Sequence, residues 1–182
     1  MKSLDGATVL VVGAGDIGLR FAAMCRAMGA RTVGLKRSVC PPPAGLCEVH
    51  AIAELDAWLP LADVVALVLP HSTETDHIMD GRRLGLMKED AILLNAGRGS
   101  AVDPDALLDT LRSGRLWGAC LDVTEPEPLP ADSPLWDQEN LLLTPHVAGG
   151  LHLEGPRERI VGIALENLKH YLAGEPLKNR YR

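Results

Sequence analysis

The chain has 182 residues, which is enough for one domain with a substantial buried core that needs no disulfides or metals to hold it. With 47% hydrophobic residues, 23% charged residues and a formal net charge of -6, its composition is that of a globular protein. This balance argues against a nucleic-acid partner, which would need clustered Lys and Arg, and an aromatic content of 3% indicates no surface for stacking bases.

The cysteine spacing and the apolar runs bear on metal binding, on the redox compartment and on membrane association. Cys25, Cys40, Cys47 and Cys120 show no C-x-x-C spacing, so we expect free thiols in a reducing compartment and no metal site. The N-terminus has no apolar signal core, and Val64–Leu69, one of the longest apolar runs, is too short to span a membrane. We therefore expect a cytoplasmic protein without a membrane partner.

Apolar runs alternate with helical patterns along the chain, which is typical of βαβ units and a parallel sheet. In chain order, the predicted strands are Thr8–Val12, Arg31–Leu35, a weaker one at Glu48–His50, Val64–Leu69, Ala91–Asn95, Gly118–Asp122 and Leu141–Thr144. The predicted helices are Ile17–Met28, a short one around Glu54–Leu59, one from Asp103-Pro104 to about Leu111, and one from Glu154 or Pro156 to Leu172. The fold class is α/β: a Rossmann-type doubly wound parallel sheet of about seven strands with helices on both faces.

Prolines indicate one helix start and one surface loop. Asp103 followed by Pro104 is an acidic N-cap with proline at the first helical position, which predicts a helix start at this point. Thr124–Asn140 holds four prolines between two predicted strands, so we expect a surface excursion there.

The residues Gly13-Ala14-Gly15-Asp16-Ile17-Gly18 follow the first predicted strand and open the first helix. In this context the spacing indicates a dinucleotide site: Gly13 permits the tight turn, Gly15 lets the backbone approach a pyrophosphate, and Gly18 allows close packing of helix and strand. Free amides at the helix start would face the phosphates.

The end of the second predicted strand bears on the choice of cofactor. An acidic residue there would hold the ribose hydroxyls of NAD, but this chain has Lys36-Arg37-Ser38. Because Arg can bind a 2′-phosphate through two parallel hydrogen bonds, we predict that NADP is preferred over NAD, with a solvated basic pair as the alternative.

Three polar residues stand downstream of the glycine turn, each at a predicted strand end or in the loop after one: Arg98, Glu127 and His146. The segments around them are Leu86-Met87-Lys88, Asn95-Ala96-Gly97-Arg98-Gly99, Val102-Asp103, Asp122-Val123-Thr124-Glu125-Pro126-Glu127-Pro128 and Thr144-Pro145-His146-Val147-Ala148-Gly149. With these segments the chain resembles the nucleotide-binding domain of the D-isomer-specific 2-hydroxyacid dehydrogenases, from Leu4 to Leu177.

The resemblance implies hydride transfer between NAD(P)H and a 2-keto acid or D-2-hydroxy acid, with three catalytic residues. Arg98 would hold the substrate carboxylate and polarise the carbonyl. His146 would exchange the proton with the substrate oxygen, and Glu127 would orient the ring and favour imidazolium. Glu125 is the rival carboxylate, but the glutamate of the family precedes the second proline, which favours Glu127.

The residues predicted to bind the cofactor, including those carried over from the resemblance, are Gly13, Gly15, Asp16, Ile17, Gly18, Lys36, Arg37, Leu69, Pro70, Thr75, Ala96, Arg98, Asp122, His146, Ala148 and Gly149. The other histidines, at positions 50, 71, 77, 152 and 170, show no ligand cluster and are expected to be surface or structural residues.

The whole chain, 1–182, is interpreted as one NAD(P)-binding Rossmann domain, with 151–182 as a C-terminal helix and tail. By the resemblance, that segment would return to a second, substrate-binding domain, most of which has no counterpart here. We therefore expect cofactor binding with weak or absent turnover. A homodimer is also expected, with Leu135-Trp136 as a candidate contact.

Two alternatives share the fold. One is a non-enzymatic dinucleotide-sensing or corepressor-like interaction module, which can retain the same polar residues. The other is a hydrolase that uses NAD internally, which the Thr144-Pro145-His146 placement disfavours.

Overall fold

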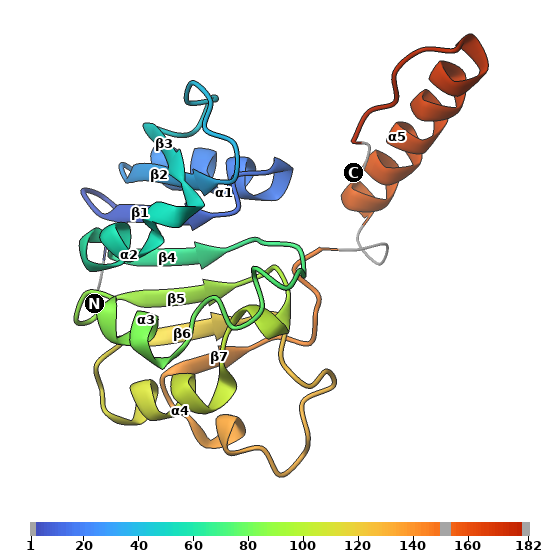
Figure 1. Ribbon diagram of the computed structural model, residues 1–182. Helices are drawn as coiled ribbons and strands as arrows, with labels where there is room; N and C mark the ends of the chain where they lie inside the picture. Colours follow the sequence, from blue (N-terminus) through green and yellow to red (C-terminus); the bar gives the residue numbers. More distant parts are fainter. Residues whose placement is uncertain (1–2, 150–153, 180–182) are drawn as a thin grey trace. The chain divides into compact units, whose positions relative to one another are not determined.

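A computed structural model of the chain describes residues 3–149 and 154–179 (Figure 1). It divides into two compact units, Met1–His146 and Val147–Arg182. Positions 151–153 and 180–182 of the predicted C-terminal segment lie outside the described residues. The first unit carries the sheet, and each unit is described by itself below.

The first unit is built on a seven-stranded sheet in the order β3-β2-β1-β4-β5-β6-β7, with every neighbouring pair parallel. The strands are β1 (Thr8–Val12), β2 (Arg31–Lys36), β3 (Glu48–Ala51), β4 (Val64–Leu67), β5 (Ile92–Asn95), β6 (Gly118–Leu121) and β7 (Leu141–Leu143). This confirms the predicted α/β, Rossmann-type fold. Chain order reverses direction between β1 and β4, which is the position where doubly wound sheets form a ligand crevice.

The central strands are apolar because both of their faces are covered. Leu10 of β1 lies opposite Val33 of β2 and Val65 of β4, and all three side chains are fully buried. A parallel sheet needs cover on both faces, so its strands read as continuous apolar runs rather than alternating ones.

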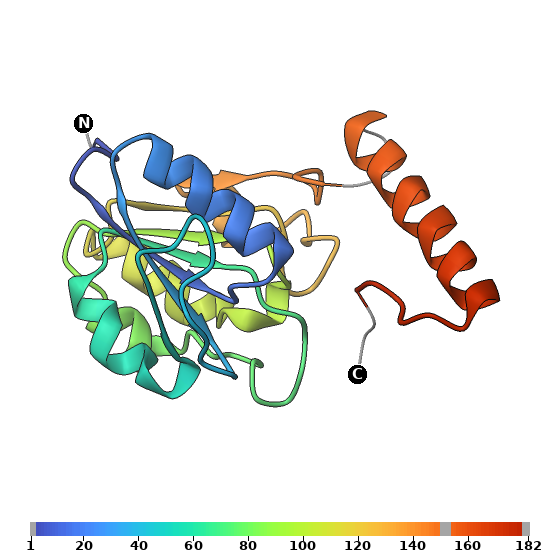
Figure 2. The same cartoon turned by 90° about the horizontal axis from the view of Figure 1, so that it is seen from above.

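Helices cover the sheet on both faces (Figure 2). Helix α1 (Asp16–Ala27) packs Ala22 and Cys25 against Val9 and Val11 on one face. Helices α2, α3 and α4 contribute to the larger apolar cluster on the other face. Their bounds are Leu55–Trp58, Gly81–Leu86 and Pro104–Arg112. Short 3-10 turns lie at Ile52–Glu54, Leu59–Leu61, Gly99–Ala101 and Pro134–Asp137.

The predicted start of α4 is confirmed. The carboxylate of Asp103 accepts hydrogen bonds from the backbone N–H groups of Asp105 and Ala106, each at 3.1 Å, and Pro104 occupies the first helical position. The residue pattern therefore specifies this helix locally, through its cap.

The larger differences from the sequence predictions are one strand end and one helix that was not predicted. Strand β4 ends at Leu67, because the chain leaves the sheet ahead of Pro70, which has no N–H to donate. Helix α3 was not predicted, since its six residues are too few to show a helical period. Its N-cap is Asp80, whose carboxylate accepts from the Arg83 N–H at 2.8 Å.

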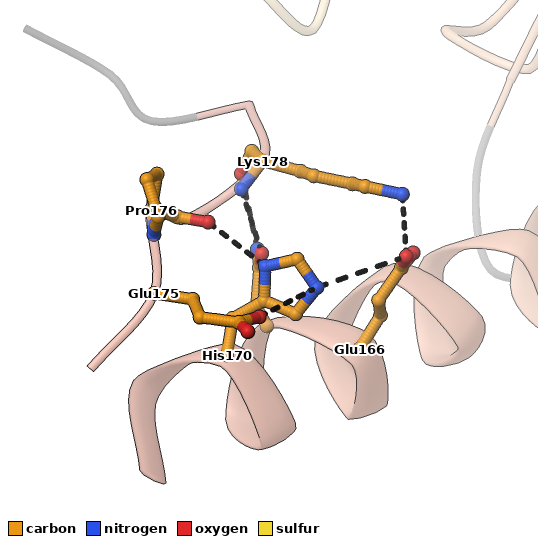
Figure 3. A network of polar contacts seen from close by, with 6 residues as sticks. Glu166, His170, Glu175, Pro176 and Lys178 are labelled. Atoms are coloured by element: carbon orange, nitrogen blue, oxygen red, sulfur yellow. Dashed lines mark hydrogen bonds and ion pairs between the residues drawn. The ribbon is translucent and has the colours of Figure 1, made fainter. Parts of the chain in front are cut away.

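The second unit consists of helix α5 (Glu154–Ala173) and a tail that folds back along it (Figure 3). The helix ends before Gly174, whose φ of +72° suits glycine and turns the chain. Asn167 donates to the Lys178 carbonyl at 3.0 Å and accepts from the Lys178 N–H at 2.8 Å, while a ring nitrogen of His170 lies 2.9 Å from the Pro176 carbonyl. Lys178 also pairs with Glu166, which lowers the pKa of that carboxyl.

No helix in the described ranges is both long enough and apolar enough to cross a bilayer.

Candidate active site

The predicted site residues of the first unit stand after strands, in the loops at the carboxyl edge of the sheet. Strand β1 is followed by the glycine turn, β5 by Arg98, β6 by the segment that carries Glu127, and β7 by His146. Because parallel strands share one direction, these loops meet at the same edge. Residues separated by more than a hundred positions are thereby brought to one side of the sheet.

The glycine turn has the shape that a bound dinucleotide requires. Gly13 has a φ of +103°, and a Cβ built there would lie 2.4 Å from the Val68 carbonyl oxygen. A Cβ on Gly18 would lie 2.3 Å from the Gly13 carbonyl oxygen, so this position needs glycine for helix packing. A Cβ on Gly15 would meet nothing within 4 Å, which leaves open space above the turn. The residues present fit a pyrophosphate-bearing cofactor.

The start of α1 supports the same conclusion. Gly15 is its N-cap and supplies no side-chain hydrogen bond to the first turn, in which Asp16 and Ile17 are both exposed. The N–H groups of a helix start have no partner within the helix, and the positive end of the helix dipole favours an anion there. The phosphates of a dinucleotide would meet these amides.

The basic residues after β2 occupy the expected end of that strand. Lys36 is its last residue, half-buried with Nζ 3.8 Å from the Cys40 sulfur, and Arg37 is exposed in the loop beyond it. Burial raises the pKa of the Cys25 thiol of α1, and the four cysteines are free.

Asn95, which the sequence reading left without a role, organises the loop that carries Arg98. Its side chain is 1% exposed, donates to the Arg98 carbonyl at 2.9 Å and accepts from the Gly97 N–H at 3.1 Å. The Arg98 guanidinium donates to the Gly97 carbonyl at 2.7 Å. A polar residue at the end of a buried strand was the signal that could have identified it.

The Arg98 loop is packed tightly between two others. A Cβ on Gly97 would lie 2.7 Å from backbone atoms of Leu69, and one on Gly99 would lie 2.0 Å from the Thr124 carbonyl oxygen. Both positions therefore require glycine. The two contacts hold the loop after β5 against the loops after β4 and β6.

His146 and Glu127 form a close pair. Nδ1 of His146 lies 2.6 Å from Oε1 of Glu127, and both side chains are about half exposed. The backbone of His146 has a φ of +55°, and its N–H donates to the Asp122 carbonyl at 2.9 Å, which ties the loop after β7 to β6. Because the carboxylate engages Nδ1, Nε2 is the ring nitrogen that could exchange a proton with a bound group.

The rival carboxylate has a different partner. Oε2 of Glu125 lies 3.2 Å from Nε2 of His77, and the His77 N–H donates to the Ser100 carbonyl at 2.6 Å. His71 lies 2.9 Å from the Ser100 hydroxyl through Nδ1. The two glutamates of one turn thus engage two different histidines.

Two other residues predicted to bind the cofactor, Thr75 and Asp122, are buried. Thr75 is buried, and its hydroxyl donates to the Pro70 carbonyl at 2.8 Å, so this hydroxyl stabilises its own turn. Asp122 is buried and accepts from the Thr144 hydroxyl at 2.5 Å. Asp122 and burial both raise the pKa of the Cys120 thiol, with burial the larger effect. Ala148 and Gly149 belong to the second unit.

The prediction of a homodimer contact at Leu135-Trp136 is wrong for Leu135. Leu135 is 4% exposed and packs inward from the turn Pro134–Asp137, so the proline-rich excursion is partly a core segment. Trp136 is 54% exposed, and its indole N–H donates to the Pro130 carbonyl at 2.8 Å.

No group of three or more His, Cys, Asp or Glu side chains is placed to hold a metal ion within residues 3–149 and 154–179.

Among curated proteins, the chain is 39% identical over 168 residues to an (S)-sulfolactate dehydrogenase from Chromohalobacter salexigens, covering 92% of the chain and 54% of that protein. It is 42% identical over 126 residues to glyoxylate/hydroxypyruvate reductase B from Pectobacterium carotovorum, covering 69% and 39%. The chain thus spans about half the length, or less, of these curated relatives.

Solved structures resemble the chain over nearly its whole length. A D-isomer specific 2-hydroxyacid dehydrogenase from Xanthobacter autotrophicus, in complex with NADPH and MES, matches with a TM-score of 0.86 at 36% identity, over 97% of this chain and 54% of that one. An NADPH-dependent glyoxylate/hydroxypyruvate reductase from Sinorhizobium meliloti, in complex with NADP and sulfate, also gives 0.86, at 30% identity over 97% and 56%.

The family model for the D-isomer specific 2-hydroxyacid dehydrogenase, NAD binding domain, matches residues 1–148. The chain therefore belongs to the D-isomer specific 2-hydroxyacid dehydrogenase family and carries its nucleotide-binding domain.

Proposed function

We propose that this chain provides the cofactor-binding and proton-exchanging part of an NADP-preferring dehydrogenase that interconverts a 2-keto acid and a D-2-hydroxy acid. The observation that carries the proposal is the pair of Glu127 and His146, 2.6 Å apart, at the sheet edge that also holds the glycine turn. An imidazole backed by a carboxylate beside a dinucleotide site is suited to oxidation of an alcohol or reduction of a carbonyl.

The dinucleotide, when bound, supplies or accepts the hydride. During reduction, His146 donates a proton from Nε2 to the oxygen of the keto group, while Glu127 holds the ring through Nδ1. Arg98 binds the substrate carboxylate with its fork of donors, and Asn95 and the tight contacts of Gly97 and Gly99 fix the loop from which it extends. The reverse reaction returns the proton to Nε2.

The experiment is steady-state turnover of glyoxylate and hydroxypyruvate, the substrates in the names of the relatives. Because proton transfer by a positioned group contributes roughly 10²- to 10⁴-fold, we expect His146→Ala to lower kcat within that range and Glu127→Gln to lower it less. NADPH binding should stay within about twofold of the wild type, since neither residue lies on the glycine turn. His50→Ala, on β3, is the control and should leave turnover unchanged.

Relatives are nearly twice as long, and the family resemblance implies a second domain that closes over the site. We therefore expect slow turnover by these 182 residues alone. Unchanged activity in His146→Ala would contradict the proposal. Tight NADPH binding with no turnover, even with a relative's substrate domain fused to the chain, would favour the dinucleotide-sensing alternative.

The preference for NADP rests on Lys36 and Arg37 at the end of β2, where no carboxylate repels a 2′-phosphate. Titration of both reduced cofactors should give a lower Kd for NADPH, and a lower Kd for NADH would overturn this part of the proposal.

We further propose a homodimer, because Ile160, Leu165 and Leu168 of α5 are about half exposed, and light scattering would test it. The free cysteines are compatible with a cytoplasmic site of action.

A further inference from the structure

A cavity of about 410 Å³ lies in the first unit, between the proline-rich segment and the end of β7. Glu127 and His146 line it, together with the apolar side chains of Leu129, Trp136 and Leu143. Its size is within the range of small-molecule sites, roughly 300 to 1,000 Å³. The pair proposed to exchange the proton therefore borders a preformed, largely apolar space.

The polar groups around this cavity are already paired with one another or with nearby backbone. The Thr144 hydroxyl donates to Asp122 at 2.5 Å, the Thr124 hydroxyl donates to the Pro126 carbonyl at 3.0 Å, and the indole N–H of Trp136 donates to the Pro130 carbonyl. Apart from Nε2 of His146, a ligand acceptor group would have to displace these bonds to gain a donor. The wall thus favours apolar contact.

Trp136 gives the cavity a fixed wall. Its ring is 54% exposed, yet its N–H is bonded and the preceding residue, Leu135, is anchored in the core at 4% exposure. A large apolar ring held in place beside a cavity can bury its surface against a ligand without losing much side-chain freedom on binding.

The positions of Arg98 and His146 determine which part of a 2-keto acid can enter the cavity. A 2-keto acid has three substituents on its reacting carbon: the oxygen, the carboxylate and the side chain. His146 lines the cavity, so the oxygen lies at its border, whereas Arg98 is not among the residues that line it. With the carboxylate held at Arg98, the side chain is the substituent left to occupy the cavity.

We propose that this cavity is the side-chain pocket of the site and that it selects 2-keto acids with an unbranched apolar side chain of three or more carbons over glyoxylate. This inference rests on the proposed function, because it takes His146 as the proton-exchanging group. Trp136 is its specificity-determining residue, and Leu129 and Leu143 complete the apolar wall.

The test follows binding rather than turnover. The ¹⁵N-labelled chain, saturated with NADP⁺, is titrated with glyoxylate, 2-oxobutanoate, 2-oxopentanoate and 2-oxohexanoate, and the indole N–H signals are recorded. The Trp136 signal should move while that of Trp117, similarly exposed at 53% but outside the cavity, stays in place. Because a buried methylene contributes about 0.8 kcal/mol, the Kd should fall about fourfold for each added methylene.

Trp136→Ala should flatten this dependence on chain length, and Trp117→Ala is the matched control that should keep it. Leu129→Ser is a second wall variant, with the same expected flattening, for the case that Trp136→Ala does not fold. A wild-type Kd that does not change along the series, or a gradient that survives both wall variants, would overturn the pocket assignment.

The outcome also separates the two proposals. Binding of every keto acid with equal affinity, weakened by Arg98→Ala, would remove the pocket and leave the proposed function standing. Failure of all four acids to bind, also in the chain fused to a relative's substrate domain, would remove both.

Discussion

Gly13, Gly15 and Gly18 belong to one motif but meet three different surroundings. Added carbons at the first and third would collide with backbone oxygens at 2.4 and 2.3 Å, whereas one at Gly15 would extend into open space. Gly13 and Gly18 are therefore required by the fold itself. The fold leaves space at Gly15, so we expect the requirement for glycine there to come from the bound cofactor.

Gly15→Val is the substitution that separates folding from binding. Gly15 has an extended backbone with a φ of -92°, which valine adopts readily, so we expect an unchanged Tm. The added side chain would occupy the space over the first-turn amides, and the Kd for NADPH should rise about tenfold or more. Fluorescence titration and thermal melts measure the two effects.

Gly85→Ala in α3 is the control for an added Cβ that meets nothing within 4 Å. It should leave the Kd for NADPH unchanged and should not lower the Tm, because alanine favours the helix more than glycine does. Gly18→Ala is expected to lower the Tm. Loss of stability in Gly15→Val without loss of NADPH affinity would contradict this division of roles.

At this scale the sequence predicted the residues but not all of their partners. The motif around Glu127 favoured it over Glu125 as the partner of His146, and the structure places it 2.6 Å from that ring. The Asn95 contacts to the Arg98 loop and the Glu125–His77 pair were not predicted. The Glu125–His77 pair depends on how separate loops approach one another, which no local pattern encodes. The Asn95 contacts are local, and a polar residue at the end of a buried strand was their signal in the sequence.

Among the elements, α4 is specified by its own residues. Asp103 caps it with two hydrogen bonds and Pro104 fixes its first turn, so its start was read from the sequence alone. Its buried residues Leu107, Leu108 and Leu111 then dock it on the sheet.

Asp103→Ala should lower the free energy of unfolding by about 1 kcal/mol, the usual cost of losing an N-cap. Urea melts measure the change. Asp105→Ala removes a carboxylate from the same first turn without removing the cap, and it should cost clearly less. Equal losses in the two variants would show that charge near the helix start, rather than the cap, stabilises α4.

The central strands were predicted well because burial on both faces makes them continuous apolar runs bounded by glycine and proline. Helix α3 escaped prediction because its six residues show no complete period, and its place depends on packing against α4. The end of β4 was placed two residues late, since Val68 and Leu69 remain apolar after leaving the sheet. Leu69 belongs to the larger core cluster and Val68 packs against the smaller one, which accounts for their apolar character.

At the scale of the molecule, ion pairs link the first unit's stability to pH. Arg82, and next Arg83, lower the pKa of the Asp56 carboxyl by hydrogen bonding to it, and Arg31 lowers that of Glu48. A carboxyl whose pKa is lower in the folded than in the unfolded state stabilises the fold above the unfolded value, near 4. That contribution is lost as the pH falls through the folded value.

We therefore expect the free energy of unfolding to change little between about pH 7 and 5 and to fall below about pH 4. Asp56→Asn should be slightly less stable than the wild type at neutral pH, with the difference shrinking in acid as the wild-type carboxyl is protonated. Urea melts across this range test the sign. A difference that grows in acid would contradict it, and Glu74→Gln controls for the loss of one negative charge.

The gathering of the candidate groups on loops beyond the strand ends has a consequence for how such a protein can diversify. Strand interiors and helix faces form the buried scaffold. Arg98, Glu127 and His146 instead extend from the loops that follow β5, β6 and β7. Exchanging one connecting segment for that of a relative at about 40% identity should retune chemistry without rebuilding the scaffold. For this reason, relatives that share one fold can act on different substrates.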